Sequence, residues 1–102
     1  MTADEKKIFL DAIRTYGATS QITMVFEEMS ELQKALCKYL RGYENFYNVA
    51  NIAEEIADVG IMLDQMTLFF TCGNYVEAVR AEKVRRLEKR LEEAKHENRR
   101  PG

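Results

Sequence analysis

The sequence predicts an all-α protein, and three observations support this fold class. Glycine occurs only five times in 102 residues, and the single proline is Pro101. Since glycine and proline are the residues that most often interrupt a helix, long continuous helices are expected. The alternation of β-branched and polar residues that is typical of strands is almost absent.

Apolar residues that recur every three to four positions divide the chain into four predicted helices. The first is expected from Asp4 to Tyr16, with Thr2 as its N-cap and Glu5 completing a capping box. Glycines or short polar turns separate the helices. The other three are expected over residues 19–41, 48–70 and 75 to the mid-nineties, and a frayed tail is expected at about 97–102.

The predicted core follows the apolar stripes of these helices. The first helix is expected to turn Ile8, Phe9, Ala12 and Ile13 inward, and the second Ile22, Val25, Phe26, Met29, Leu32 and Leu36. The third is apolar most of the way round, so it must be covered on several sides. We therefore expect a homodimer or homotetramer with the third helix near the interface.

Length and composition favour one soluble domain over residues 1–102. Two cysteines without a CxxC pair, and a charged rather than apolar N-terminal stretch, favour a reduced, cytoplasmic protein. The segment 52–70 approaches the length of a membrane span, but it contains four acidic residues that are costly in lipid. We interpret it as a buried helix of a soluble protein with no membrane partner.

Charge is distributed unevenly along the chain. Residues 1–79 hold 6 basic and 12 acidic side chains, a net charge of −6, whereas residues 80–102 hold 9 and 5, a net charge of +4. An acidic body is thus followed by a basic helix. Nucleic-acid binding is not favoured, because the basic residues are interleaved with acids and the pI is 5.5.

Two acidic stretches, EEMSE at 27–31 and EEIAD at 54–58, interrupt apolar stripes. At about 100° per residue, Glu28 and Glu31 share a helix face, as do Glu55 and Asp58. If the two helices pack side by side, these four carboxylates converge, and a hard cation such as Mg²⁺ or Mn²⁺ would relieve their repulsion. One such pattern alone is common on solvated helix faces, but two on adjacent helices favour a metal site.

The paired motif resembles that of the MazG-like all-α nucleoside triphosphate pyrophosphohydrolases, over about residues 20–90. The resemblance implies a four-helix bundle that dimerises through its central helices. It also implies Mg²⁺-dependent cleavage of a nucleoside triphosphate between its α- and β-phosphates. Carried over to this sequence, the metal-binding and catalytic residues are Glu28, Glu31, Glu55 and Asp58. Glu27 and Glu54 point away from the main stripe and are expected in an outer role or in solvent.

Basic residues of the last predicted helix are candidates for binding the substrate phosphates. Lys83, Arg86 and Arg90 recur at helical spacing, and the family has similar basic residues after its third helix. The competing interpretation is a solvated helix, in which Glu82 and Arg86 form a surface ion pair four residues apart.

Two other functions remain open from the sequence. A phosphoribosyl-ATP pyrophosphohydrolase would use the same carboxylates on another substrate. A non-catalytic helical module would use the stretch VRRLEKRLEEAK as a short coiled coil and bind a nucleotide or a partner. A di-iron carboxylate bundle is set aside, because it needs Glu-x-x-His motifs that the single histidine does not provide.

Overall fold

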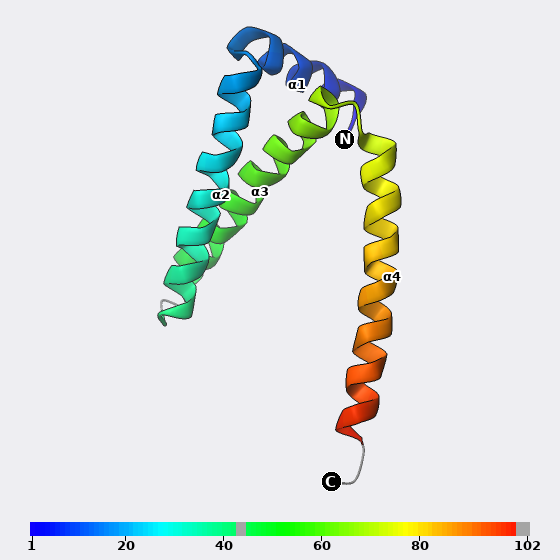
Figure 1. Cartoon of the computed structure of the whole chain (residues 1–102). Helices are drawn as coiled ribbons and strands as arrows, with labels where there is room; N and C mark the ends of the chain where they lie inside the picture. The colour runs from blue at the N-terminus through cyan, green and yellow to red at the C-terminus, as the bar shows by residue number, and fades with distance from the viewer. Residues whose placement is uncertain (43–44, 100–102) are drawn as a thin grey trace. The chain divides into compact units, whose positions relative to one another are not determined.

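The computed structural model describes residues 1–42 and 45–99, and this part of the chain contains four helices and no strand. The helices are α1 (Ala3–Tyr16), α2 (Ala18–Leu40), α3 (Phe46–Phe69) and α4 (Gly73–Asn98), as Figure 1 shows. The all-α prediction is therefore confirmed. The chain divides into two compact units, Met1–Thr71 and Cys72–Gly102, which are described separately.

Helix α1 begins with the predicted capping box. The Thr2 hydroxyl accepts a hydrogen bond from the Glu5 backbone N–H at 3.1 Å, and the Thr2 backbone N–H donates to the Glu5 carboxylate at 2.7 Å. The helix ends at Gly17, whose φ of 91° is readily adopted only by glycine. This turn directs the chain straight into α2, so that α1 packs against both α2 and α3 at one end of their hairpin (Figure 1).

Helices α2 and α3 form an antiparallel hairpin, the most extensive helix pair of the first unit. The hairpin buries fewer apolar side chains than the sequence predicts. Phe26, Met29 and Leu36 of the predicted stripe are exposed, and so is Ile8 of α1. The buried residues of the hairpin are Gln21, Ala35, Met62 and Gln65. The residues that are buried in the hairpin therefore lie beside the apolar stripe that the sequence predicted, and not on it.

Helix α3 begins earlier than predicted because Asn45 caps it. The Asn45 side-chain oxygen accepts a hydrogen bond from the Asn48 backbone N–H at 2.9 Å, which places the first helical residue at Phe46. The helix continues through Gly60, where an added Cβ would meet no neighbouring atom within 4 Å. Among the described residues, no other helix therefore approaches α3 closely at Gly60.

The second unit consists of α4, which begins at Gly73, two residues before the predicted start. None of its described residues is buried. Of the tail predicted at 97–102, residues 97 and 98 belong to α4, and residues 100–102 lie outside the described part. Among the helices described, none is long and apolar enough to cross a membrane.

Candidate functional site

Three of the four predicted metal ligands come together in the α2–α3 hairpin. Glu28 lies on α2, and Glu55 and Asp58 lie one turn apart on α3. Each offers a carboxylate oxygen, and these three oxygens lie within 4.8 Å of one another. We call Glu28, Glu55 and Asp58 the acidic triad. It forms because the hairpin is antiparallel, so that the middle of α2 faces the first half of α3.

The triad is partly buried and partly exposed to solvent. Glu28 and Glu55 are half-buried, whereas Asp58 is exposed. Partial burial raises the pKa of Glu28, and the neighbouring carboxylates, Asp58 foremost, raise it further. The pKa of Glu55 is raised by the same two causes in the same order. The charged forms of these carboxylates thus repel one another in surroundings that hydrate them incompletely.

Glu31, the fourth predicted ligand, is not part of the triad. Its side chain is 52% exposed, and one carboxylate oxygen lies 3.5 Å from the Lys34 ammonium, one turn further along α2. Its charge nevertheless contributes to the raised pKa values of Glu28 and Glu55. Glu31 therefore borders the triad without joining it.

The two remaining acids of the motifs, Glu27 and Glu54, are exposed. They stand outside the triad, as their positions on the helices predicted. Each raises the pKa of its neighbour in sequence, and in both cases this is the smallest of the causes. They are therefore suitable reference positions for experiments on the triad.

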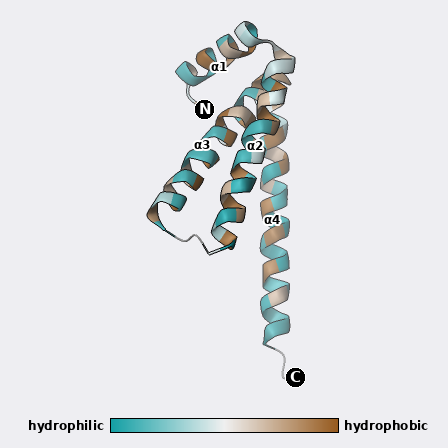
Figure 2. Ribbon diagram, turned by 90° about the vertical axis from the view of Figure 1, so that its left-hand side faces the viewer, coloured by the Kyte–Doolittle hydropathy of each residue, from teal (hydrophilic) through white to brown (hydrophobic). Residues whose placement is uncertain are grey.

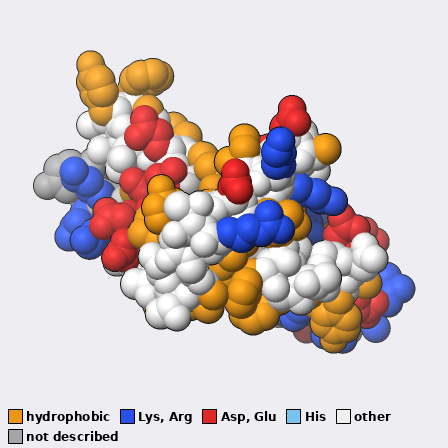
Figure 3. All heavy atoms as spheres, turned by 90° about the horizontal axis from the view of Figure 1, so that it is seen from above, with side chains coloured by type: hydrophobic (Ala, Val, Ile, Leu, Met, Phe, Trp, Pro, Cys, Tyr) orange, Lys and Arg blue, Asp and Glu red, His pale blue; other side chains and the backbone are white. Residues whose placement is uncertain are grey.

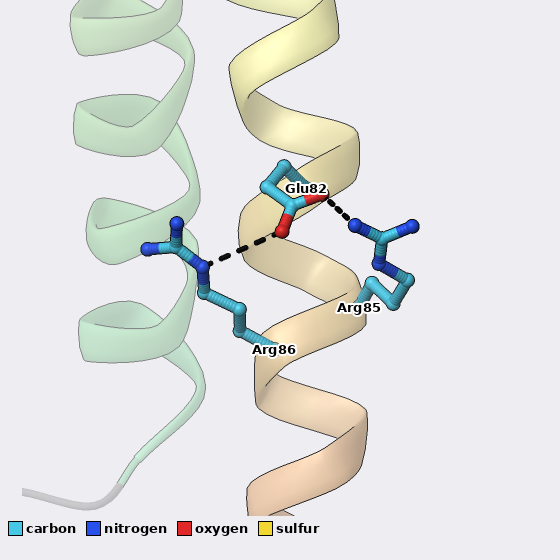
Figure 4. Close-up of polar contacts among 3 residues, drawn as sticks. All are labelled: Glu82, Arg85 and Arg86. Atoms are coloured by element: carbon cyan, nitrogen blue, oxygen red, sulfur yellow. Dashed lines mark hydrogen bonds and ion pairs between the residues drawn. The ribbon is translucent and has the colours of Figure 1, made fainter.

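The predicted phosphate-binding residues, Lys83 and Arg86, lie on α4 in the second unit, and their surroundings differ. Arg86 holds its Nε 3.5 Å from a carboxylate oxygen of Glu82, and Arg85 binds the other oxygen of Glu82 (Figure 4). The predicted surface ion pair of Arg86 is thus present. Lys83 instead lines a shallow groove along α4, together with a set of apolar and basic residues: Val76, Val79, Arg80, Val84, Leu87 and Arg90.

Arg80 was missed by sequence reasoning, which began the basic stripe at Lys83. Arg80, Lys83, Leu87 and Arg90 recur at intervals of three and four residues and so lie along one face of α4. Arg80 follows the apolar beginning of the helix, which gave no reason to include it. It is as well placed on this face as Lys83 is.

A buried polar pair in the same hairpin was also missed. Gln21 on α2 and Gln65 on α3 are 6% and 5% exposed, and the Gln21 side-chain amide donates a hydrogen bond to the Gln65 side-chain oxygen at 2.7 Å. Neither residue belongs to a charged motif, and glutamine is most often a surface residue. Each lies seven residues from a member of the triad, but this relation is recognisable only once the packing of the hairpin is known, so the sequence alone offered no signal.

The triad has the chemistry of a site for a hard divalent cation. Its donors are carboxylate oxygens only, the ligand type that Mg²⁺ and Mn²⁺ prefer, and it lacks the thiolate and imidazole donors that favour zinc or copper. Three close carboxylates with two raised pKa values also form a place where binding a cation removes an electrostatic cost. The residues present therefore fit such an ion.

Comparisons of the chain with protein-family models, with curated proteins and with solved structures found no match. The function is therefore argued from the residues of the site and from the resemblance of their motifs.

Proposed function

We propose that the protein is a Mg²⁺-dependent nucleotide pyrophosphohydrolase of the MazG-like type. It would cleave a ribo- or deoxyribonucleoside triphosphate between the α- and β-phosphates, giving a monophosphate and pyrophosphate. One observation carries this proposal: acids from two separate motifs, 27–31 on α2 and 54–58 on α3, converge in one half-buried triad. Because like charges repel, this convergence costs free energy that a bound cation would offset.

In this proposal the triad holds Mg²⁺, or Mn²⁺ in its place, and Glu31 is the fourth ligand. The bound ion would supply charge neutralisation on the phosphates and a lowered pKa for the attacking water. Glu31 is exposed, and its Lys34 ion pair at 3.5 Å is a loose one. Such exposed pairs contribute at most about 1 kcal/mol, so the carboxylate is free to turn toward the triad.

The general base would be a carboxylate of this site that is not fully engaged as a ligand. In the metal-free site burial and neighbouring carboxylates raise the pKa of Glu28 and of Glu55, whereas a bound cation would oppose this shift.

The outer phosphates need cations, because an acidic site alone repels them. We assign this role first to Lys83, which lies among Arg80 and Arg90 on one face of α4. Arg86 is the weaker candidate, because Glu82 already neutralises it. The proposed enzyme is cytoplasmic and acts as a homodimer or homotetramer.

The two alternatives differ from this proposal in ways that can be measured. A phosphoribosyl-ATP pyrophosphohydrolase would keep the triad and its metal dependence but act on a different substrate. A non-catalytic helical module would bind a nucleotide or a partner without turnover. The convergence of the two acidic motifs favours an enzyme over the module, since a scaffold gains nothing from clustered like charges.

The test is a hydrolysis panel with Mg²⁺ over standard and modified nucleoside triphosphates, with the products separated by ion-exchange chromatography. Monophosphate and pyrophosphate are expected from at least one substrate. The variant Glu55→Gln should lose this activity, whereas the matched control Glu54→Gln, on the neighbouring exposed acid, should keep it. Diphosphate and phosphate as products would reject the proposed cleavage, and no turnover would move the test to phosphoribosyl-ATP.

A further inference from the structure

The Gln21–Gln65 pair is an unusual component for the contact between two helices. Both amides are almost fully buried, and one hydrogen bond of 2.7 Å joins them across the hairpin. The other two buried residues of the hairpin, Ala35 and Met62, are apolar. Two apolar residues of similar size would fill this position without the cost of removing two amides from water. The pair therefore calls for a role other than packing.

The positions of the pair and of the triad are related through the hairpin. Gln21 lies seven residues before Glu28 on α2, and Gln65 lies seven residues after Asp58 on α3. Because the helices are antiparallel, the step from Gln21 to Glu28 and the step from Gln65 to Asp58 run in the same direction through space. Both steps span two helical turns, so the alignment that pairs the glutamines also brings Glu28 to Asp58.

Apolar contacts alone would fix this alignment poorly. Helices α2 and α3 both carry hydrophobic residues along their length (brown in Figure 2), and many of these are exposed rather than buried between the helices. A slip of one turn moves a helix by about 5.4 Å, and other apolar residues would then meet. The same slip would place Gln21 opposite Met62 or Leu68 and leave buried amides unpaired. A buried polar pair that penalises every other alignment is a known means of specifying register.

We propose that the Gln21–Gln65 hydrogen bond fixes the register of the α2–α3 hairpin and thereby positions Glu28 against Glu55 and Asp58. The two glutamines are positioning residues, since neither belongs to the triad and they act through the alignment of the helices. This inference rests on the proposed function for its consequence, the assembly of a metal site. The register itself is a property of the protein without metal.

The test replaces both glutamines by methionine, which has a similar length and no strong hydrogen-bonding group. In the Gln21→Met/Gln65→Met variant the melting temperature should stay the same or rise, because no amide is buried. The Mn²⁺ affinity, measured by electron paramagnetic resonance, should fall about tenfold or more. The NMR spectrum of the metal-free variant should show broadened or multiple signals from α2 and α3, where the wild type shows one sharp set.

The control is Met62→Leu, which changes a buried side chain of the same hairpin but leaves the pair intact. It should keep the wild-type Mn²⁺ affinity and the single set of signals. If the methionine variant does not fold, Gln21→Leu/Gln65→Leu takes its place with the same readouts. A double variant with one sharp set of signals and unchanged Mn²⁺ affinity would overturn the inference.

These measurements separate the register inference from the proposed function. If the wild type binds no Mn²⁺, the metal site is rejected, and the NMR comparison alone decides whether the pair fixes the register. If the wild type binds Mn²⁺ and hydrolyses a triphosphate, the double variant should lose activity mainly in kcat. Misplaced ligands impair the chemical step, whereas the phosphate-binding residues of α4 are unchanged.

Discussion

At the scale of single residues, each glutamate of the triad raises the free energy of the metal-free fold. Glu55→Gln removes one of three close carboxylates, so we expect a higher melting temperature without metal at neutral pH. The same change should reduce Mg²⁺-dependent activity by at least about 100-fold, since even residues behind a ligand are commonly worth 10- to 100-fold. Thermal melts without Mg²⁺ measure the rise in melting temperature of the metal-free variant. Melts with Mg²⁺ measure whether the wild type becomes the more stable protein when the ion binds.

The control for this experiment is Glu54→Gln, which changes the same chemical group on an exposed neighbour. It should retain the rise in melting temperature that Mg²⁺ produces in the wild type through binding to the folded state. A rise of the same size in Glu55→Gln would place the metal elsewhere in the protein.

The raised pKa values of Glu28 and Glu55 also predict how the site responds to pH. A carboxyl group whose pKa is higher in the folded state binds protons more tightly there than in the unfolded chain. This tighter proton binding stabilises the folded state at low pH, and the stabilisation is lost as the pH rises through the folded-state pKa. The metal-free protein should therefore lose stability from this source as the pH rises above the ordinary range of glutamate.

Metal binding should show the opposite trend. Protons and Mn²⁺ compete for the same oxygens, so the affinity should increase with pH until Glu28 and Glu55 are both ionised. Mn²⁺ titrations that begin below the ordinary glutamate pKa of 4.5 and continue to neutral pH would cover this change. An affinity that stays constant from below the ordinary glutamate pKa of 4.5 up to neutral pH would show that neither glutamate is a ligand.

The acids of the site could be predicted from the sequence, because a spacing of three residues and a helical period fix which carboxylates share a face. The position of Glu31 could not, because all four acids satisfy that spacing and only the packing of α2 against α3 separates three from the fourth. Gln21 and Gln65 could not be predicted either. A buried hydrogen bond between residues 44 positions apart leaves no pattern in either local sequence.

At the scale of helices, caps fixed the boundaries more reliably than hydrophobicity did. The capping box of Thr2 and Glu5 was predictable from four residues, and α1 begins directly after this cap at Ala3, one residue before the predicted Asp4. Asn45 caps α3 by the same physics, but this cap was not recognised in the sequence, and the helix was expected from residue 48 rather than from Phe46. The buried faces of the helices were harder to predict than their ends, because α2 and α3 are apolar on more sides than a two-helix contact can bury.

The cap of α1 gives a prediction at this scale. Thr2→Ala removes the hydroxyl that accepts a hydrogen bond from the Glu5 backbone N–H at 3.1 Å. The expected loss of stability is about 1 kcal/mol, measured by chemical denaturation. Thr23→Ala is the matched control, since the Thr23 hydroxyl bonds a carbonyl inside α2 and caps nothing. Equal losses in both variants would show that the cap is not what stabilises α1.

At the scale of the whole molecule, the first unit leaves an unusual amount of apolar surface in contact with water. Among the described residues, only Phe9, Ala35 and Met62 are buried hydrophobic residues, and no side chain is buried completely. The surface view in Figure 3 shows hydrophobic side chains exposed among charged ones. Four exposed residues recur every seven positions along α3 and its C-cap, each 50–60% exposed: Val49, Ile56, Leu63 and Phe70.

An apolar stripe with a period of seven residues is the pattern by which a helix packs against a second helix. The two-helix contact of a hairpin cannot bury it, because Glu55 and Met62 of α3 already face α2. Helix α2 presents exposed residues of its own, including Phe26, Met29 and Leu36. Two hairpins that covered these faces mutually would complete a four-helix core. This is the physical basis for the dimer expected from the apolar character of residues 48–70.

The last prediction is therefore a self-associating protein whose interface includes this stripe of α3. Sedimentation equilibrium should give a mass of at least twice the 11.9 kDa of one chain. Ile56→Lys places a charge in the middle of the stripe and should shift the protein toward monomers, whereas Ile8→Lys, at an isoleucine of α1 that is 63% exposed, should not. If both variants keep the wild-type mass, the interface lies elsewhere. A wild type that remains monomeric at all concentrations would contradict the predicted dimer itself.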